Sequence, residues 1–176
     1  MGRRPVSEFS RAYWDSCAWL GLLNSEPAKV KPLRHLYESA RRNQFEIWTS
    51  AIAYVEVFRL VSETNDSKPL GDENLDLIRD VIEQPFVKLI PVDMEIGREA
   101  RRLRRQLPNF KGAGDAVHLA SAIKWNVNPL HTWDGAHLLH LDKKLKCKDG
   151  TTLEICRPSN PESGPLFAEK EVGDGS

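Results

Sequence analysis

The sequence contains few cysteines, and their spacing is irregular. Cys17, Cys147 and Cys156 are the three cysteines in 176 residues, and no two of them form a CxxC pair. An odd, scattered set argues against the disulfide framework of small secreted domains. We therefore expect reduced thiols, no disulfide and a cytoplasmic location.

Long apolar runs and net charge are also lacking. The N-terminal stretch MGRRPVSEFSRAYWD has basic residues but no apolar core of signal-peptide length, and no later stretch has the length of a membrane span. We expect no contact with a membrane. The 25 basic residues balance the 25 acidic ones, so no overall electrostatic field would attract a nucleic acid. Any such contact must come from a local cluster.

What the sequence does contain is an alternation of β-branched or aromatic runs with amphipathic helical patterns. Such an alternation predicts right-handed crossovers and an α/β fold whose mainly parallel sheet is covered by helices on both faces. The predicted strands are 11–15, 45–50, 86–92, 128–134 and 151–158, and the predicted helices are 16–24, 31–43, 51–63, 70–85, 93–107, 115–125 and 135–141.

One domain accounts for most of the chain. A length of 176 residues suits a single domain with a substantial core. We place this domain at residues 1–157. Residues 158–176 are rich in Pro, Gly, Ser and charge, and they are predicted to form a flexible C-terminal tail.

Acidic residues occur where the predicted strands end. Asp15 closes the first strand, Asp134 closes the fourth, and Asp115 stands at the start of a helix. In an open parallel sheet the loops at the carboxyl ends of the strands converge on one crevice, and helices usually begin there. We therefore expect three aspartates from remote parts of the chain to meet at that edge.

A fourth acid, Glu56, lies inside the mostly apolar pattern AIAYVEVFRLV, where burying a lone carboxylate would be costly. Each acid also has an ordinary explanation. Asp15 and Asp115 could be helix N-caps. Glu56 could pair with Arg59, and Asp134 before Gly135 could be a turn residue. The convergence of all four on one edge favours a functional site.

Four facing carboxylates repel one another unless a cation neutralises them. Mg²⁺ or Mn²⁺ is the expected occupant, because hard cations take oxygen ligands. Two such ions about 4 Å apart would activate water and stabilise the leaving oxygen of a phosphodiester. Ser16 and Thr132 supply hydroxyls that could orient a carboxylate or a bound water, although a local backbone hydrogen bond is the alternative.

The ordered set YWDS, TSAIAYVE, GAGDAVHLASA and TWD resembles the PIN domain, and most closely the VapC-type ribonuclease toxins of type II toxin–antitoxin pairs. The resemblance covers roughly residues 11–156. It implies a three-layer α/β/α sandwich and Mg²⁺- or Mn²⁺-dependent endonucleolytic cleavage of RNA. It also implies an antitoxin in the active-site groove and a homodimer, which we expect to form through the N-terminal helices with Trp19 or Leu36 exposed.

The resemblance places the family's four acidic metal ligands on particular residues of this chain. They fall on Asp15, Glu56, Asp115 and Asp134, which are thereby the expected catalytic residues. Ser16 and Thr132 fall where the family usually has Ser or Thr. One departure follows the fourth acid: family members often carry a further acid and an aromatic there, whereas this chain has His137 and no acid before Asp142.

An arginine-rich helix lies close to Asp115 in sequence. Such runs are usually solvated faces, but beside a nuclease site they could also contact the RNA backbone. The candidates for that contact are Arg98, Arg101, Arg102, Arg105 and Lys111.

Histidines near the acids allow further alternatives. His137 and His140 have a helical i, i+3 spacing that could serve zinc, although no fourth ligand follows at a suitable spacing. His118 shares a helix face with Asp115, so we expect it to line the floor of the site or to bond within the core rather than act as a general base. Two rival functions stay open: a PIN-type nuclease of RNA or DNA processing, and a non-catalytic module that binds RNA or protein.

Overall fold

The structure is a computed structural model that describes residues 10–63 and 69–159. Its centre is a five-stranded sheet in the order β3-β2-β1-β4-β5, and each pair of neighbouring strands is parallel. The predicted parallel sheet is therefore confirmed. The strands are β1 (Arg11–Trp14), β2 (Glu46–Ser50), β3 (Val87–Ile90), β4 (Leu130–His131) and β5 (Ile155–Cys156).

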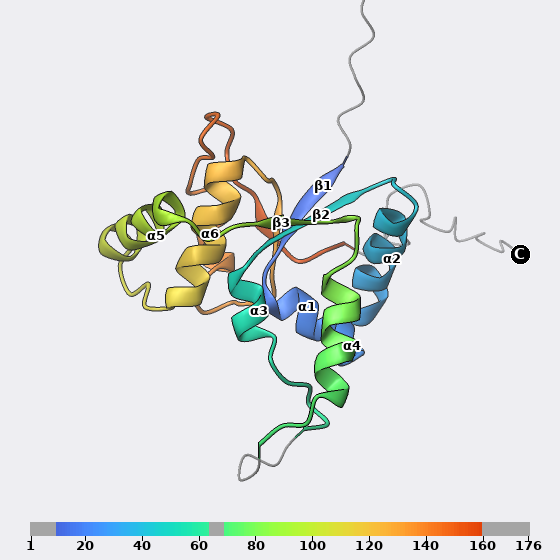
Figure 1. The fold of residues 1–176 in the computed structure, drawn as a ribbon. Coiled ribbons are helices and arrows are strands. Elements are labelled where there is room, and N and C mark those ends of the chain that lie inside the picture. Colours follow the sequence, from blue (N-terminus) through green and yellow to red (C-terminus); the bar gives the residue numbers. More distant parts are fainter. Residues whose placement is uncertain (1–9, 64–68, 160–176) are drawn as a thin grey trace, which may run out of the picture.

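Helices cover both faces of the sheet, which gives the three layers implied by the resemblance (Figure 1). One face carries α1 (Ser16–Leu23), α2 (Val30–Arg41) and α4 (Glu73–Ile82). The other face carries α5 (Met94–Gln106) and α6 (Ala113–Trp125), with the single 3₁₀ turn Leu139–Leu141. The short helix α3 (Ile52–Glu56) follows β2 at the lower edge of the sheet in Figure 1.

The central strand β1 separates two hydrophobic cores. Successive side chains of a strand point to opposite faces. Tyr13 accordingly packs in the core under α5 and α6, while Ala12 and Trp14 pack in the core under α1, α2 and α4. Burial of β1 on both faces places its carboxyl end, and Asp15 after it, in the middle of the molecule.

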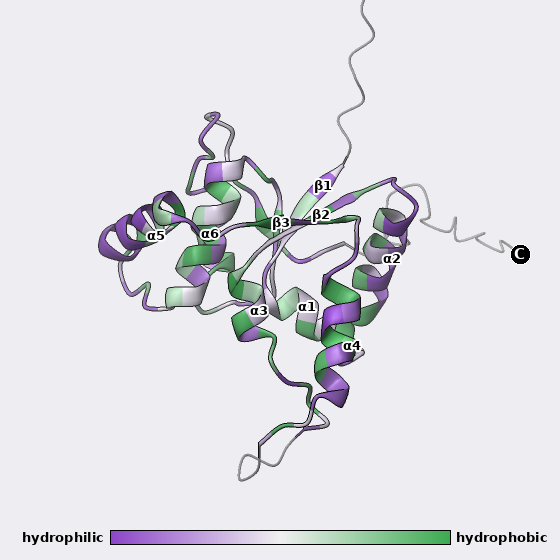
Figure 2. Ribbon diagram, viewed as in Figure 1, coloured by the Kyte–Doolittle hydropathy of each residue, from purple (hydrophilic) through white to green (hydrophobic). Residues whose placement is uncertain are grey.

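The helix α5 has the predicted amphipathic pattern. Ile96, Ala100 and Leu103 are buried, and α5 packs on α6. The outer surface of α5 is the most continuously hydrophilic helical surface in Figure 2, because its arginines point away from the sheet. Asp93 caps this helix by accepting a hydrogen bond from the backbone N–H of Ile96 at 2.9 Å.

The predicted helix 51–63 was wrong beyond Glu56, where α3 ends. Side chains replace the helical hydrogen bonds that would have followed. Glu63 accepts from the backbone N–H of Leu60 at 2.7 Å, and Asn24 accepts from that of Val61 at 2.9 Å. β-Branched residues such as Val57 also have low helix propensity. Glu56 is therefore the last residue of a short helix rather than the middle of a long one.

Other elements are shorter than predicted. β4 and β5 have two residues each, and residues 135–138 form turns before the single 3₁₀ turn. All three cysteines are free. Of Trp19 and Leu36, either of which was expected at an exposed dimer surface, Trp19 is fully buried, its ring packs against Trp14, and its indole N–H donates to Thr49, whereas Leu36 is partly exposed. In the described ranges, no helix has the length and apolar character needed to cross a membrane.

Candidate active site

Four acidic residues are positioned by the carboxyl ends of the strands and the helices that begin there. Asp15 follows β1, Asp134 follows β4, and Glu56 ends the helix after β2. Asp115 lies in the first turn of α6, which packs on α3. Figure 1 shows the starts of α1 and α6 gathered with α3 at this edge of the sheet. The structure thus brings the four acids of the sequence analysis into one region.

Asp15 is the deepest of the four, with 2% of its surface exposed. One carboxylate oxygen caps α1 by accepting from the backbone N–H of Ala18 at 3.0 Å, and the other accepts from the Thr132 hydroxyl. Burial raises the pKa of Asp15 to about 6, and the negative charge of Asp115 adds to that shift. Asp15 therefore caps α1, as the capping interpretation predicts, and also lies close to Asp115.

Glu56 is held by two donors. The Ser16 hydroxyl donates to its Oε2 at 2.7 Å, and His118 Nε2 lies 2.8 Å from the same oxygen. Since an ionised carboxylate can only accept, His118 carries its proton on Nε2. Burial acts to raise the pKa of Glu56, but the hydrogen bonds from His118 and Ser16 outweigh it, so the pKa is lowered. Glu56 stays ionised at neutral pH.

His118 is itself anchored in the core under α6. It is 1% exposed, and its Nδ1 lies 2.7 Å from the hydroxyl of Tyr13. That hydroxyl is also 2.9 Å from the Ser50 hydroxyl. A buried chain of hydrogen bonds thus runs from β1 and β2 through His118 to Glu56. Sequence reasoning placed His118 in the core or at the floor of the site but gave no role to Tyr13 and Ser50, although both lie in the motifs YWDS and TSAIAYVE.

Two glycines make room for the carboxylates. A Cβ on Gly114 would lie 1.6 Å from Glu56 Oε1, and a Cβ on Gly112 would lie 1.9 Å from Asp115 Oδ2. Any side chain at either position would displace an acid. The stretch GAGD therefore has a steric reason for both glycines, which the sequence alone showed only as flanking residues.

Asp115 is the third residue of α6 and is not its cap, because Gly112 occupies the N-cap position. The alternative reading of Asp115 as an N-cap was therefore wrong. Burial raises the pKa of Asp115, and repulsion from Asp134 raises it further. Such repulsion is the electrostatic mark of acids that share one small volume.

Asp134 stabilises a turn with one carboxylate oxygen and faces the other acids with the second. Its Oδ1 accepts from the backbone N–H groups of Ala136 at 2.8 Å and His137 at 2.9 Å, as the turn interpretation predicts. Its Oδ2 faces His137 Nδ1 at 3.2 Å, and the same nitrogen lies 3.1 Å from Asp115 Oδ2. One atom from each of Asp115, Asp134 and His137 lies within 4.8 Å of the others.

The donor set fits a divalent cation. Glu56, Asp115 and Asp134 are partly exposed at the edge of the sheet, while Asp15 closes the floor below them. Burial raises the pKa values of Asp15 and Asp115, and repulsion between neighbouring acids adds to both shifts, so a cation would stabilise the ionised cluster. Carboxylate oxygens are the ligands that Mg²⁺ and Mn²⁺ take in proteins.

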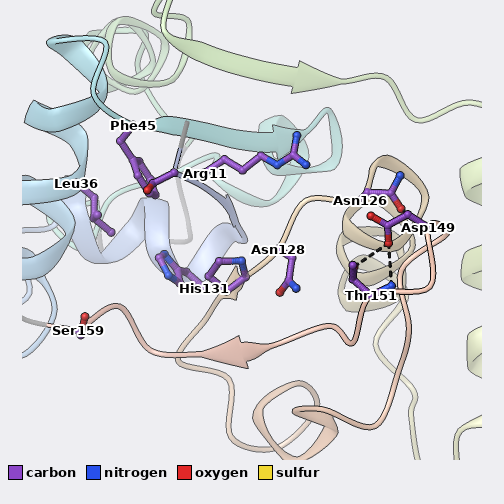
Figure 3. Close-up of a pocket in the computed structure, with 11 residues that line it drawn as sticks. Arg11, Leu36, Phe45, Asn126, Asn128, His131, Asp149, Thr151 and Ser159 are labelled. Atoms are coloured by element: carbon purple, nitrogen blue, oxygen red, sulfur yellow. Dashed lines mark hydrogen bonds between the residues drawn. The ribbon is translucent and has the colours of Figure 1, made fainter. Parts of the chain in front are cut away.

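A separate cavity of about 560 Å³ lies towards the amino ends of the strands, and Figure 3 shows it. Arg11, Phe45, Asn128 and His131 are among its lining residues, and none of the four acids is. Asp149 in this cavity accepts hydrogen bonds from Thr151. Its size alone does not make it the catalytic site, because it holds no group of acids.

The arginines of α5 are all exposed, as is Lys111 beyond its end. Arg102 is engaged in an ion pair with Glu99. Arg104 donates to the backbone carbonyl of Lys111 at 3.0 Å, which ties the end of α5 to the segment leading to Asp115.

Comparisons with known proteins agree with this architecture. No curated protein matches the chain. The crystal structure of VapC20 from Mycobacterium tuberculosis, a toxin that cleaves the sarcin–ricin loop, is similar with a TM-score of 0.55 and 19% identity. That match covers 72% of this chain and 92% of that chain.

A chain of VapBC2 from Rickettsia felis, solved bound to a DNA fragment from the promoter, is similar with a TM-score of 0.54 and 18% identity over 82% of this chain and 98% of that chain. At these identities the likeness concerns the fold. The sequence profile of the PIN domain matches residues 12–148, which is more than half of the chain. The chain belongs to the PIN-domain family.

Proposed function

We propose that the protein is a Mg²⁺- or Mn²⁺-dependent endoribonuclease and the toxin of a type II toxin–antitoxin pair. The observation that carries this proposal is the convergence of Asp15, Glu56, Asp115 and Asp134 at the carboxyl edge of the sheet. A module that only binds RNA or protein has no use for mutually repelling carboxylates. The similarity to VapC20, which is described as a toxin, and to VapBC2 supports the biological role.

Glu56, Asp115 and Asp134 would hold the cation, with Asp15 beneath them. When bound, the cation supplies an activated water and neutralises charge that develops on the phosphodiester. Ser16 and His118 fix the orientation of Glu56, and Thr132 fixes that of Asp15. Removing a hydrogen bond that orients a metal ligand commonly changes metal affinity or activity by about 10- to 100-fold.

The exposed cations of α5 would contact the RNA backbone. Phosphate contacts by Arg and Lys supply most of the sequence-independent affinity for nucleic acid. The helix presents this surface next to the loop that leads to Asp115. The residues proposed for this contact are Arg98, Arg101, Arg102, Arg105 and Lys111, of which Arg102 is held by Glu99.

An antitoxin would cover the same edge. Val55, Phe58 and Val61 flank Glu56 and are 68%, 57% and 70% exposed, which is unusual for large apolar side chains. A hollow of about 380 Å³ beside them includes both Glu56 and Phe58 in its lining. An apolar segment that carries one Arg or Lys would match this surface, because the cation would satisfy the carboxylates.

The proposed homodimer needs a surface other than Trp19, which is buried. Light scattering of the purified chain, alone and with its antitoxin, measures the stoichiometry directly.

Two assays test the proposal. The purified chain should cleave a labelled RNA pool in Mg²⁺ or Mn²⁺ and stop when EDTA is added. Expression of the chain alone should arrest growth, and co-expression of the neighbouring small gene should restore it. Cleavage without growth arrest would leave the chain a nuclease of RNA processing, and RNA binding without cleavage would make it a binding module.

A further inference from the structure

The imidazole of His137 lies between two of the site carboxylates. Its Nδ1 is 3.1 Å from Asp115 Oδ2 and 3.2 Å from Asp134 Oδ2. The local turn fixes this position, because Asp134 Oδ1 accepts from the backbone N–H of His137 at 2.9 Å. The side chain is 40% exposed, so solvent and ions reach it.

These spacings match those of ligands around one metal ion. Mg²⁺ binds octahedrally at about 2.0–2.1 Å, so neighbouring ligand atoms are roughly 3.0 Å apart, the bond length times the square root of two. The two nitrogen–oxygen distances of 3.1 and 3.2 Å are close to that edge length. A cation could therefore bind all three residues with only small side-chain shifts.

We propose that His137 is a nitrogen ligand of the metal site and that it shifts the preference of the site towards Mn²⁺ over Mg²⁺. This inference rests on the proposed metal site of the nuclease. Imidazole suits the later transition metals best, and both Mg²⁺ and Mn²⁺ take mainly oxygen ligands, but Mn²⁺, as a first-row transition metal, accepts a nitrogen ligand more readily than Mg²⁺ does. Replacing an oxygen ligand by a nitrogen ligand therefore lowers the affinity of the site for Mg²⁺ more than its affinity for Mn²⁺.

The same contacts would also arise if protonated His137 acted only as a counter-ion for Asp115 and Asp134. The two roles differ in what a bound metal does to the ring. As a ligand, His137 loses its proton and bonds to the metal through Nδ1. As a counter-ion, it is displaced when the metal neutralises the two acids.

Pulsed electron paramagnetic resonance of the full chain with one equivalent of Mn²⁺ separates these roles, since a coordinated imidazole gives a ¹⁴N coupling. The coupling should be present in the parent chain and absent in His137→Ala. His140→Ala is the matched control, because His140 is exposed three residues further on and should keep the coupling. Circular dichroism verifies that each variant is folded.

Calorimetric titration gives the second readout. His137→Ala should weaken Mn²⁺ binding by tenfold or more and should change Mg²⁺ binding less, because even the loss of a hydrogen bond to a metal ligand costs about 10- to 100-fold in affinity. His137→Asp should bind Mn²⁺ without a ¹⁴N coupling and should bind Mg²⁺ more tightly than the parent.

A parent chain that binds no Mn²⁺, or that shows no ¹⁴N coupling, overturns the inference. So does a coupling that survives in His137→Ala or that disappears in His140→Ala. RNA cleavage by the parent chain in Mg²⁺ without any ¹⁴N coupling in Mn²⁺ would refute the inference but keep the proposed function. A coupling without RNA cleavage would do the reverse.

Discussion

Asp15, directly after β1, and His131, the last residue of the neighbouring β4, are both buried, but their pKa values shift in opposite directions. At the carboxyl end, Asp15 is 2% exposed and both its oxygens accept hydrogen bonds, yet burial still raises its pKa to about 6. His131, the last residue of β4, is 7% exposed beside the 560 Å³ cavity, its Nδ1 has no hydrogen-bond partner among the described residues, and burial lowers its pKa to about 4.

The difference lies in what surrounds each group. Burial is the main cause of the raised pKa of Asp15, and the negative charge of Asp115 adds to it, so a nearby cation would lower that pKa. Burial causes the lowered pKa of His131, and its neutral ring needs no counter-charge. A cluster of like charges therefore distinguishes the candidate active site from a cavity that is merely large.

The largest expected effect comes from removing a charge from the cluster. Asp115→Asn or Asp134→Asn should lower RNA cleavage by about 10²- to 10³-fold, because a metal supplies several kcal/mol of transition-state stabilisation. Asp149→Asn, in the opposite cavity, is the matched control and should cleave like the parent. Equal losses in all three variants, measured as initial rates, would mean that the site is misassigned.

A smaller loss should follow from crowding Glu56. Gly114→Ala places a Cβ where Glu56 Oε1 now lies, and the flexible carboxylate must move away. We expect RNA cleavage to fall by about 10- to 100-fold, as for other losses of orientation around a metal, with little change in the melting temperature.

Gly97→Ala is the control for this glycine substitution. Gly97 lies inside α5, and nothing lies within 4 Å of a Cβ placed there. Alanine at this position should stabilise the fold by about 0.5–1 kcal/mol and leave cleavage unchanged. If Gly114→Ala retains full activity, then the position of Glu56 is not critical.

The pH dependence of stability, measured by urea unfolding in EDTA, should separate the contributions of Asp15 and His131. The pKa of Asp15 is raised from 3.8 to about 6, so native Asp15 holds its proton longer than the unfolded chain does. Its contribution to stability falls as the pH rises from about 4 to 6. The pKa of His131 is lowered from 6.5 to about 4, so as the pH falls the unfolded chain protonates His131 before the native chain does. Its contribution falls as the pH drops from 6.5 to about 4.

The two residues change the free energy of unfolding with pH in opposite directions, so their effects should partly cancel in the parent chain. Variants that lack one residue should show the effect of the other. Relative to the parent, Asp15→Asn should gain stability as the pH rises towards 6, and His131→Phe should gain as the pH falls towards 4. Each change is on the order of 3 kcal/mol at most, from a shift of about two pKa units. Slopes of the same sign in both variants would contradict these pKa assignments.

Much of the fold was predictable because alternation of strands and helices depends on local pattern. The end of α3 was not, since Leu60 and Val61 find hydrogen-bond acceptors on Glu63 and on the distant Asn24. The convergence of the acids followed from the rule that parallel strands share one functional edge. The proximity of His137 to Asp115 depends on the tertiary packing of two segments, so the sequence showed only its spacing from Asp134.

The smallest expected effect concerns where RNA lies relative to the two ends of the sheet. Arg101→Gln on α5 should lower the slope of log affinity against log salt concentration by about 0.7, the contribution of one phosphate contact on a single strand. Arg102→Gln should lower it less, because the Arg102 guanidinium is already paired with Glu99. Arg11→Gln, in the cavity at the opposite end of the sheet, should leave the slope unchanged. Fluorescence anisotropy in EDTA measures all three without cleavage. A loss of slope in Arg11→Gln, with none in Arg101→Gln, would place the RNA over the large cavity and away from the acidic edge.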